Sequence, residues 1–401
     1  MNKVSENSAF DIVISGGGLS GALTALSLSQ LTKANGEALN IAIVENAPIN
    51  TTPSLNFDDR VLALSHQSVS YLAQLNVWQH MKSAATPIET IHISDKGNYG
   101  KARIYAQEHN VSALGVVIEM ALIGKAIHQE LSQYDNISWF CPNSIANVEY
   151  QAQDVAITLD DKKVVMTKLL LGCDGGHSVV RQAAGITTTA KSYQQSALIA
   201  NVSTAKKHDN VAYERFTTNG PLAMLPLSKD RCSLVWTLPP ERAEQIQQLD
   251  EQSLKYALYE EFGPWLGEIT QVGERFVYPL HLIQATEQVS HRTILIGNAS
   301  HTIHPIAGQG FNLGLRDTKD LATAITKALD NDQDIGGLTL IQNYQAQRRQ
   351  DHQQVIGLTD SLVTLFSNEL PPLIAGRNIG LKALNYMNCI KHPFVAKTMG
   401  Y

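Results

Sequence analysis

Residues 10–21, FDIVISGGGLSG, decide the fold. A short apolar run is followed directly by glycines at positions 16, 18 and 21, and apolar residues at helical spacing then continue to Leu31. Gly16 permits a tight turn, Gly18 lets a pyrophosphate approach the backbone, and Gly21 lets the helix pack closely on the strand. The stretch therefore predicts a strand, a glycine-rich turn and a helix whose free N–H groups face the phosphates of a dinucleotide.

A second apolar run, residues 41–45 (IAIVE), ends at Glu45, 24 residues after Gly21. An acid at this position accepts hydrogen bonds from the ribose hydroxyls of an adenosine. Strand, helix and second strand form a βαβ unit, which indicates a parallel sheet. The motif alone does not distinguish NAD from FAD.

Two further motifs follow apolar strands. The first, DGGHSVVR, begins with Asp174 and Gly175; Asp-Gly alone is a common turn, but Ser178 and Arg181 are not needed for one. The second, GNASHTIHPIAGQGFNLG in residues 297–314, leads into a helix. Its glycines would place backbone N–H groups at the helix entrance, where they stabilise negative charge.

Composition excludes several classes of protein. The chain has 401 residues, which suggests two or three folding units. A net charge of −6 gives nucleic acid no electrostatic support, and the four scattered cysteines predict neither a zinc cage nor a disulfide framework. The first ten residues lack the apolar stretch that is typical of a signal peptide, and no run reaches the roughly 18 apolar residues of a membrane span. We expect a cytoplasmic protein.

Runs of β-forming residues in segments 194–237 and 272–284 predict an antiparallel sheet that interrupts the nucleotide-binding domain. The predicted fold class is α/β, with a Rossmann-like FAD-binding domain interleaved with an antiparallel-sheet substrate domain and followed by a helical C-terminal region. The FAD-binding domain is expected in residues 1–80, 106–185 and 286–335. The substrate domain is expected in residues 81–105 and 186–285, and the helical region in residues 336–401.

The three motifs, in this order, resemble those of the FAD-dependent aromatic hydroxylases of the para-hydroxybenzoate hydroxylase type, over essentially the whole chain. Arg60 in DRVLAL matches a flavin-contacting segment of that family. The stretches GPLAMLP (220–226) and RCSLVW (231–236) are most similar to the ubiquinone-biosynthesis branch, and within it to hydroxylases of 2-octaprenyl-6-methoxyphenol. Asn298 departs from the aspartate of most relatives and lacks its charge.

The resemblance implies FAD as cofactor and NAD(P)H as co-substrate. It implies that the reduced flavin reacts with O₂ to a C4a-hydroperoxide, which hydroxylates a polyprenyl phenol. The flavin carries this chemistry, so no side chain is assigned as catalytic, although Pro305 is a candidate pocket residue. No metal is expected. The cofactor-binding residues implied are Gly16, Gly18, Gly21, Glu45, Arg60, Asp174, Gly175, Asn298, Gly308, Gly310 and Asn312.

Other interpretations stay open. The chain could be a sister ubiquinone hydroxylase acting at another ring position, a flavin reductase or dehydrogenase of the same fold, or a flavin-binding scaffold. His301 and His304 could be metal ligands, but no third ligand is near them in the sequence, and packing is the simpler reading. Tyr213 and Arg215, on a predicted strand, could orient a phenol.

The end of the chain reverses the charge balance. Residues 370–401 contain no acid but four basic residues, namely Arg377, Lys382, Lys391 and Lys397. A helical cap with a solvated basic face would explain this pattern. The alternative is a peripheral contact with anionic lipid or with other ubiquinone-biosynthesis proteins.

Overall fold

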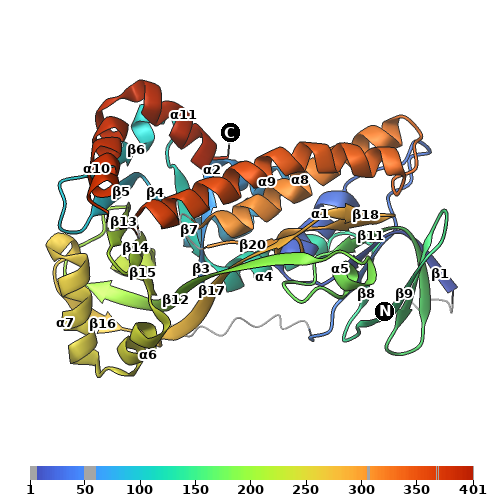
Figure 1. Ribbon diagram of the computed structural model, residues 1–401. Coiled ribbons are helices and arrows are strands. Elements are labelled where there is room, and N and C mark those ends of the chain that lie inside the picture. The colour runs from blue at the N-terminus through green and yellow to red at the C-terminus, as the bar shows by residue number, and fades with distance from the viewer. Residues whose placement is uncertain (1–6, 49–59, 305–307, 367, 369, 401) are drawn as a thin grey trace.

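The computed structural model describes residues 7–48, 60–304, 308–366, 368 and 370–400 (Figure 1). Its first sheet has the strand order β18-β19-β11-β1-β2-β8. The strands β19, β11, β1, β2 and β8 are parallel, whereas β18 lies antiparallel on the edge, and the β9–β10 hairpin joins β11. The bounds are β1 (Asn7–Ser15), β2 (Ile41–Val44), β8 (Ile137–Phe140), β9 (Ile145–Tyr150), β10 (Val155–Leu159), β11 (Val164–Gly172), β18 (Val289–Ser290) and β19 (Thr293–Leu295).

The two faces of β1 are both buried, which explains why this strand is an unbroken apolar run. Ile12 and Ile14 belong to the core beneath the helices, while Val13 belongs to the core on the other face, with Val155 and Ile157 of β10. The helices that contact one another over the first face are α1 (Leu19–Ser29), α4 (Met120–Leu131) and α8 (Gln309–Asp330).

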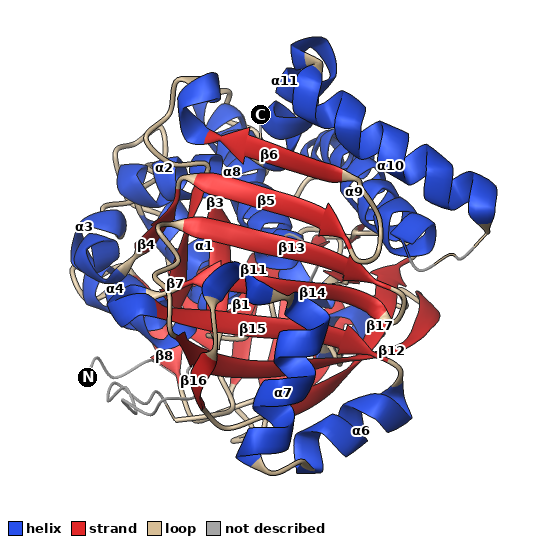
Figure 2. Cartoon of the chain, turned by 90° about the vertical axis from the view of Figure 1, so that its left-hand side faces the viewer, coloured by secondary structure: helices blue, strands red, loops and turns tan. Residues whose placement is uncertain are grey.

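The second sheet has nine strands in the order β20-β17-β12-β15-β14-β13-β5-β6, with β16 on β12. Helices α6 (Pro240–Gln248) and α7 (Glu251–Phe262) cover its outer face (Figure 2). Its strands are β5 (Thr90–Asp95), β6 (Lys101–Tyr105), β12 (Thr188–Thr204), β13 (Val211–Thr217), β14 (Gly220–Pro226), β15 (Arg231–Leu238), β16 (Ile269–Val272), β17 (Phe276–Ala285) and β20 (His301–Thr302).

This sheet departs from the antiparallel expectation at one place, because β5 and β13 are parallel. The hairpin β5–β6 comes from an earlier part of the chain than β13, so no tight turn forces the two strands to run in opposite directions. A small sheet, β3 (Val61–Ser65), β7 (Gly115–Glu119) and β4 (Thr86–Ile88), lies at the junction, and the helices α2 (His66–Gln74) and α3 (Trp78–Met81) follow β3.

The C-terminal region is helical, as predicted. Helix α9 (Leu338–Phe366) runs along α8 across the molecule, and α10 (Pro371–Tyr386) and α11 (Asn388–Thr398) fold over the β5–β6 end (Figure 1). The predicted α/β class with two sheets and a helical C-terminal region is confirmed. Among the described residues, no helix combines the length and the apolar character needed to cross a bilayer.

Candidate functional site

The three sequence motifs meet at one edge of the parallel sheet. The glycine turn follows β1, Glu45 follows β2, Asp174 follows β11, and the 3-10 helix η5 (Gly297–Ala299) follows β19. Since these four strands are neighbours and parallel, their carboxyl ends lie side by side. This is the edge at which open α/β sheets bind their ligands.

Glycine is required for different physical reasons at the three positions of the first motif. A Cβ on Gly16, whose φ is +95°, would lie 2.6 Å from the carbonyl oxygen of Cys173, and a Cβ on Gly21 would lie 1.9 Å from the carbonyl oxygen of Gly16. A Cβ on Gly18 would have no neighbour within 4 Å. Gly16 and Gly21 therefore permit close packing, whereas Gly18 leaves open space at the start of α1, whose N-terminus has no side-chain cap.

Glu45 lies against the glycine turn. Its Oε2 accepts a hydrogen bond from the backbone N–H of Gly17 (2.6 Å), and its Oε1 accepts one from Ala47 (2.8 Å). A carboxylate has about four acceptor positions, so two backbone donors leave capacity for ribose hydroxyls. The position at the end of β2 is the one expected for an acid that binds an adenosine ribose.

Asp174 has one saturated and one unsatisfied oxygen. Its Oδ2 accepts bonds from the N–H groups of Val179 (2.8 Å) and Val180 (3.2 Å) and from the hydroxyl of Ser15 (3.3 Å). Its Oδ1 is buried and has no hydrogen-bond partner among the described residues. Buried polar atoms nearly always have a partner, so this oxygen fits a ligand that carries hydroxyl groups. Gly175 follows with φ +79° and open space around it.

Ser178 and Arg181 have structural roles. The Ser178 hydroxyl accepts the N–H of Arg181 (3.0 Å) and caps the short helix α5 (Val179–Ala183). The buried guanidinium of Arg181 donates to the carbonyl oxygens of Gly176 (2.7 Å) and Ala299 (2.8 Å). Arg181 thus ties the second motif to the third.

The entrance of α8 is held by the side chain of Asn312. Gly308, at φ +62°, is the N-cap, where a Cβ would lie 3.0 Å from that of Ala63. The Asn312 amide donates to the carbonyl oxygens of Ala63 (2.8 Å) and Gly308 (2.7 Å), and its oxygen accepts from the Ser65 N–H (2.9 Å) and the Ser68 hydroxyl (2.7 Å). These four bonds use its full capacity, so Asn312 fixes the entrance.

The remaining candidate positions are more peripheral. Gly310 lies in the first turn of α8, Asn298 is exposed in η5, and Arg60 is exposed just before β3. Pro305 lies outside the described residues. The start of α8 still reaches the sheet edge, because a Cβ on Gly314 would lie 3.2 Å from the Cα of Gly297.

His301 belongs to a buried charge network that sequence reasoning missed. Asp317 of α8 accepts on one oxygen from Arg348 (2.7 Å) and pairs there with His352 (2.7 Å), both of α9. Burial alone would raise the pKa of Asp317, but these two groups hold it well below its usual range. Burial lowers the pKa of His301 to about 3, and the nearby His352 makes a second, smaller contribution in the same direction. Ligand atoms of His301, Asp317 and His352 lie within 4.8 Å of one another, yet Arg348 neutralises the carboxylate, which disfavours a cation.

Tyr213 and Arg215 face away from this site. The Arg215 Nε donates to the carbonyl oxygen of Glu261 (3.0 Å), and the Tyr213 ring packs against Phe262, both residues being in α7. The structure places both side chains between the sheet and α7, which does not support the prediction that they orient a phenol. Their neighbour Glu214 points to the other face of the sheet, which the alternation of a strand could have indicated.

Comparison with known proteins decides the family. The family model described as FAD binding domain matches residues 9–359. The chain belongs to this FAD-binding family. It is 32% identical to the ubiquinone hydroxylase UbiL of Rhodospirillum rubrum, over 97% of this chain and 89% of that protein. It is 30% identical to the 3-demethoxyubiquinol 3-hydroxylase of Escherichia coli, over 98% and 99%.

A solved structure supports the same assignment of the fold. The crystal structure of p-nitrophenol 4-monooxygenase PnpA from Pseudomonas putida matches with a TM-score of 0.79 at 17% identity, over 98% of this chain and 99% of that one.

The expectations of an FAD-dependent monooxygenase and of the ubiquinone-biosynthesis branch are confirmed by the family model and the two relatives, and FAD is the cofactor. The open space at Gly18 and the unsatisfied oxygen of Asp174 fit a dinucleotide with a hydroxylated chain.

Proposed function

We propose that this protein hydroxylates the aromatic ring of a polyprenyl phenol in ubiquinone biosynthesis, with 2-octaprenyl-6-methoxyphenol as substrate and with NAD(P)H and O₂ as co-substrates. The observation that carries the proposal is the near full-length similarity to two proteins named as ubiquinone-pathway hydroxylases. The choice of the 6-methoxy compound rests on the stretches in residues 220–226 and 231–236.

The residues of the site would hold FAD along the edge of the parallel sheet. Gly18 and the start of α1 would receive the pyrophosphate, Glu45 the ribose, and Asp174 a hydroxyl of the ribitol chain. When bound, the flavin supplies the activation of oxygen. The protein has to position the phenol and exclude water, and the start of α8 at Gly308, which has no side-chain cap, would stabilise negative charge on the flavin ring.

The proposal predicts a defined anaerobic and aerobic behaviour. With NAD(P)H under anaerobic conditions, a 2-prenyl-6-methoxyphenol should accelerate flavin reduction, and admission of oxygen should yield one hydroxylated product per reduced flavin. The visible spectrum and mass spectrometry of the phenol measure these two steps. Reduction and reoxidation that leave the phenol unchanged would favour a reductase. Hydroxylation at another ring position would favour a sister ubiquinone hydroxylase.

The C-terminal region is less basic on its surface than the sequence predicts. Arg377 is buried and its Nε pairs with Asp95 (2.8 Å), while the buried Lys391 pairs with Glu108 (3.0 Å). Two of the four cations thus neutralise acids, one at the end of β5 and one in the 3-10 helix after β6. The expected solvated basic face is wrong for Arg377 and Lys391, since their charges are needed inside the protein.

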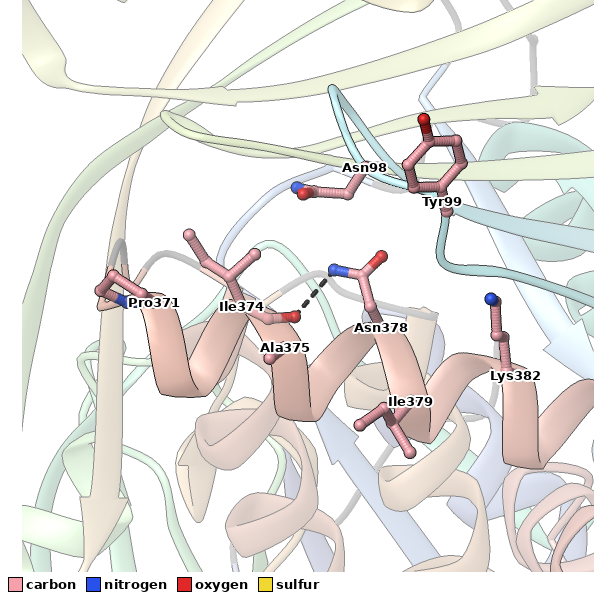
Figure 3. A pocket seen from close by; sticks show the side chains of 8 residues that line it. All are labelled: Asn98, Tyr99, Pro371, Ile374, Ala375, Asn378, Ile379 and Lys382. Atoms are coloured by element: carbon pink, nitrogen blue, oxygen red, sulfur yellow. Dashed lines mark hydrogen bonds between the residues drawn. The ribbon is translucent and has the colours of Figure 1, made fainter.

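The same region exposes apolar side chains. A groove of about 370 Å³ lies between α10 and the turn after β5, lined by Tyr99, Ile379 and Lys382 among others (Figure 3). The exposed fraction is 88% for Tyr99, 68% for Ile379 and 80% for Tyr386 at the end of α10. Exposed apolar patches of this kind mark an interaction surface. We propose that this surface contacts the bilayer in which a polyprenyl substrate dissolves.

Replacing both Ile379 and Tyr386 with serine should lower binding to phosphatidylcholine vesicles at least about tenfold, because each side chain contributes about 1.5–3 kcal/mol when buried. Flotation of the protein with phosphatidylcholine vesicles, prepared with and without phosphatidylglycerol, measures this binding. The matched control is Leu338→Ser, which removes an equally exposed apolar residue (66%) at the far end of α9 (Figure 1). Equal flotation of the double variant and the wild type would contradict the assignment of this surface.

A further inference from the structure

The inner face of the second sheet carries one unusual row of side chains. Ile93, Glu214, Ala223, Val235, Ile199 and Phe276 are successive cross-strand partners from β5 to β17. All six are half-buried, and five are apolar. Glu214 is the one charged side chain in this row, and no described residue bonds to its carboxylate.

The residues beside Glu214 on the same face are covered. Two positions earlier, Ala212 is buried with Val117 of β7, and two positions later, Phe216 stacks on Phe366 of α9 with ring centres 3.5 Å apart. The row therefore lies between two contacts that join the sheet to the rest of the protein. The partly exposed side chains of the row therefore have a packed contact with the rest of the protein on each side.

The strand β3 connects this row to the entrance of α8. Val61 packs into the cluster that contains Ala212, and two residues later Ala63 contacts Gly308. Two residues of extended strand span about 7 Å. Ala212, two positions from Glu214 on the same face, and Gly308 at the start of α8 therefore lie beside residues of β3 that are two positions apart.

On the basis of the proposed function, we infer that Glu214 accepts the proton of the substrate's phenolic hydroxyl, while the apolar row takes the aromatic ring and the start of the prenyl chain. A ligand with one hydroxyl and a large apolar body matches a surface with one acceptor in an apolar row. Tyr213 and Arg215, its neighbours in sequence, cannot serve because they face α7.

The proton transfer is balanced within the pair. The phenolic O–H bond breaks, the proton joins the Glu214 carboxylate, and the electron pair stays on the phenol oxygen, from which it enters the ring. The single negative charge moves from carboxylate to phenolate. Burial raises the pKa of Glu214 to about 7, closer to the value of about 10 of a phenol than an ordinary glutamate, which makes it the better base.

The test compares Glu214→Gln with the wild type, both loaded with FAD. The ligands are a short-chain 2-prenyl-6-methoxyphenol and its methyl ether, and calorimetry measures their affinities. Wild type should prefer the phenol by about tenfold to a hundredfold, the range of a hydrogen bond to a charged acceptor, and Glu214→Gln should lose most of this preference. Its turnover should fall about 100-fold, while FAD content and melting temperature stay at or above wild type.

The matched control is Glu244→Gln, which removes an exposed carboxylate of α6 on the outer face and should change neither quantity. A Glu214→Gln protein that keeps both the phenol preference and the turnover would overturn this inference alone. If the wild type neither binds nor hydroxylates the phenol, the proposed function fails and the role of Glu214 fails with it.

Discussion

Replacing Asp317 with asparagine should lower the free energy of unfolding by about 3 kcal/mol, because it leaves the buried Arg348 and His352 without the carboxylate between them. Asp317 is fully buried, and Arg348 is only 2% exposed. Asp320 and Asp351 also pair with Arg348, which limits the loss. Urea denaturation of the two proteins at neutral pH measures the difference.

The control for this prediction is Asp360→Asn in α9, the helix that carries Arg348 and His352. Asp360 pairs with Lys191 at 2.8 Å, but the two side chains are 32% and 54% exposed, so the change should cost less than about 1 kcal/mol. Equal losses for Asp317→Asn and Asp360→Asn would contradict the role of the buried network.

Acid should reduce the difference between wild type and Asp317→Asn. The folded protein holds the pKa of Asp317 below its unfolded value, so this carboxylate contributes stability above about pH 4 and loses it at lower pH. His301 acts over a higher range, because burial lowers its pKa to about 3 and the unfolded chain takes up its proton below about pH 6.5. The free energy of unfolding of both proteins should therefore fall as the pH drops below about 6.5.

The predicted site residues that the structure brings together at the sheet edge are those whose role is local. The glycines, Glu45 and Asp174 stand at strand ends, and a short motif determines both the strand and the turn after it. Arg181 shows where such reasoning ends. Its motif was recognisable, but its partner Ala299 lies 118 residues away, so the structural role of the guanidinium appears only in the folded chain.

The face of a strand is a second limit. Tyr213, Glu214 and Arg215 are consecutive in β13, so the side chain of Glu214 lies on one face of the sheet and those of Tyr213 and Arg215 lie on the other. The sequence does not tell which of these faces meets the cofactor domain. Helix α7 covers Tyr213 and Arg215, and on the opposite face Ala212 packs with Val117 of β7, which identifies the face that meets the cofactor domain. The same holds for Arg377 and Lys391, whose acidic partners lie more than 280 residues earlier.

Alanine at Gly18 should weaken FAD binding and leave stability unchanged, whereas alanine at Gly21 should lower stability. At Gly18 a methyl group meets nothing within 4 Å and φ is −66°, so the apoprotein should keep its stability. At Gly21 the methyl would lie 1.9 Å from the carbonyl oxygen of Gly16, so helix and strand must separate, and the free energy of unfolding should fall by about 3 kcal/mol.

FAD affinity separates the two glycines further. The Gly18→Ala methyl occupies the open space at the start of α1, where the pyrophosphate must approach the backbone, so the dissociation constant of FAD should rise at least about tenfold in a protein of normal stability. Titration of the apoprotein with FAD measures this dissociation constant. Gly357→Ala, in α9 with open space around it, is the matched control. Wild-type affinity in Gly18→Ala would place the pyrophosphate elsewhere, because a group that approaches this backbone cannot share the space with a methyl.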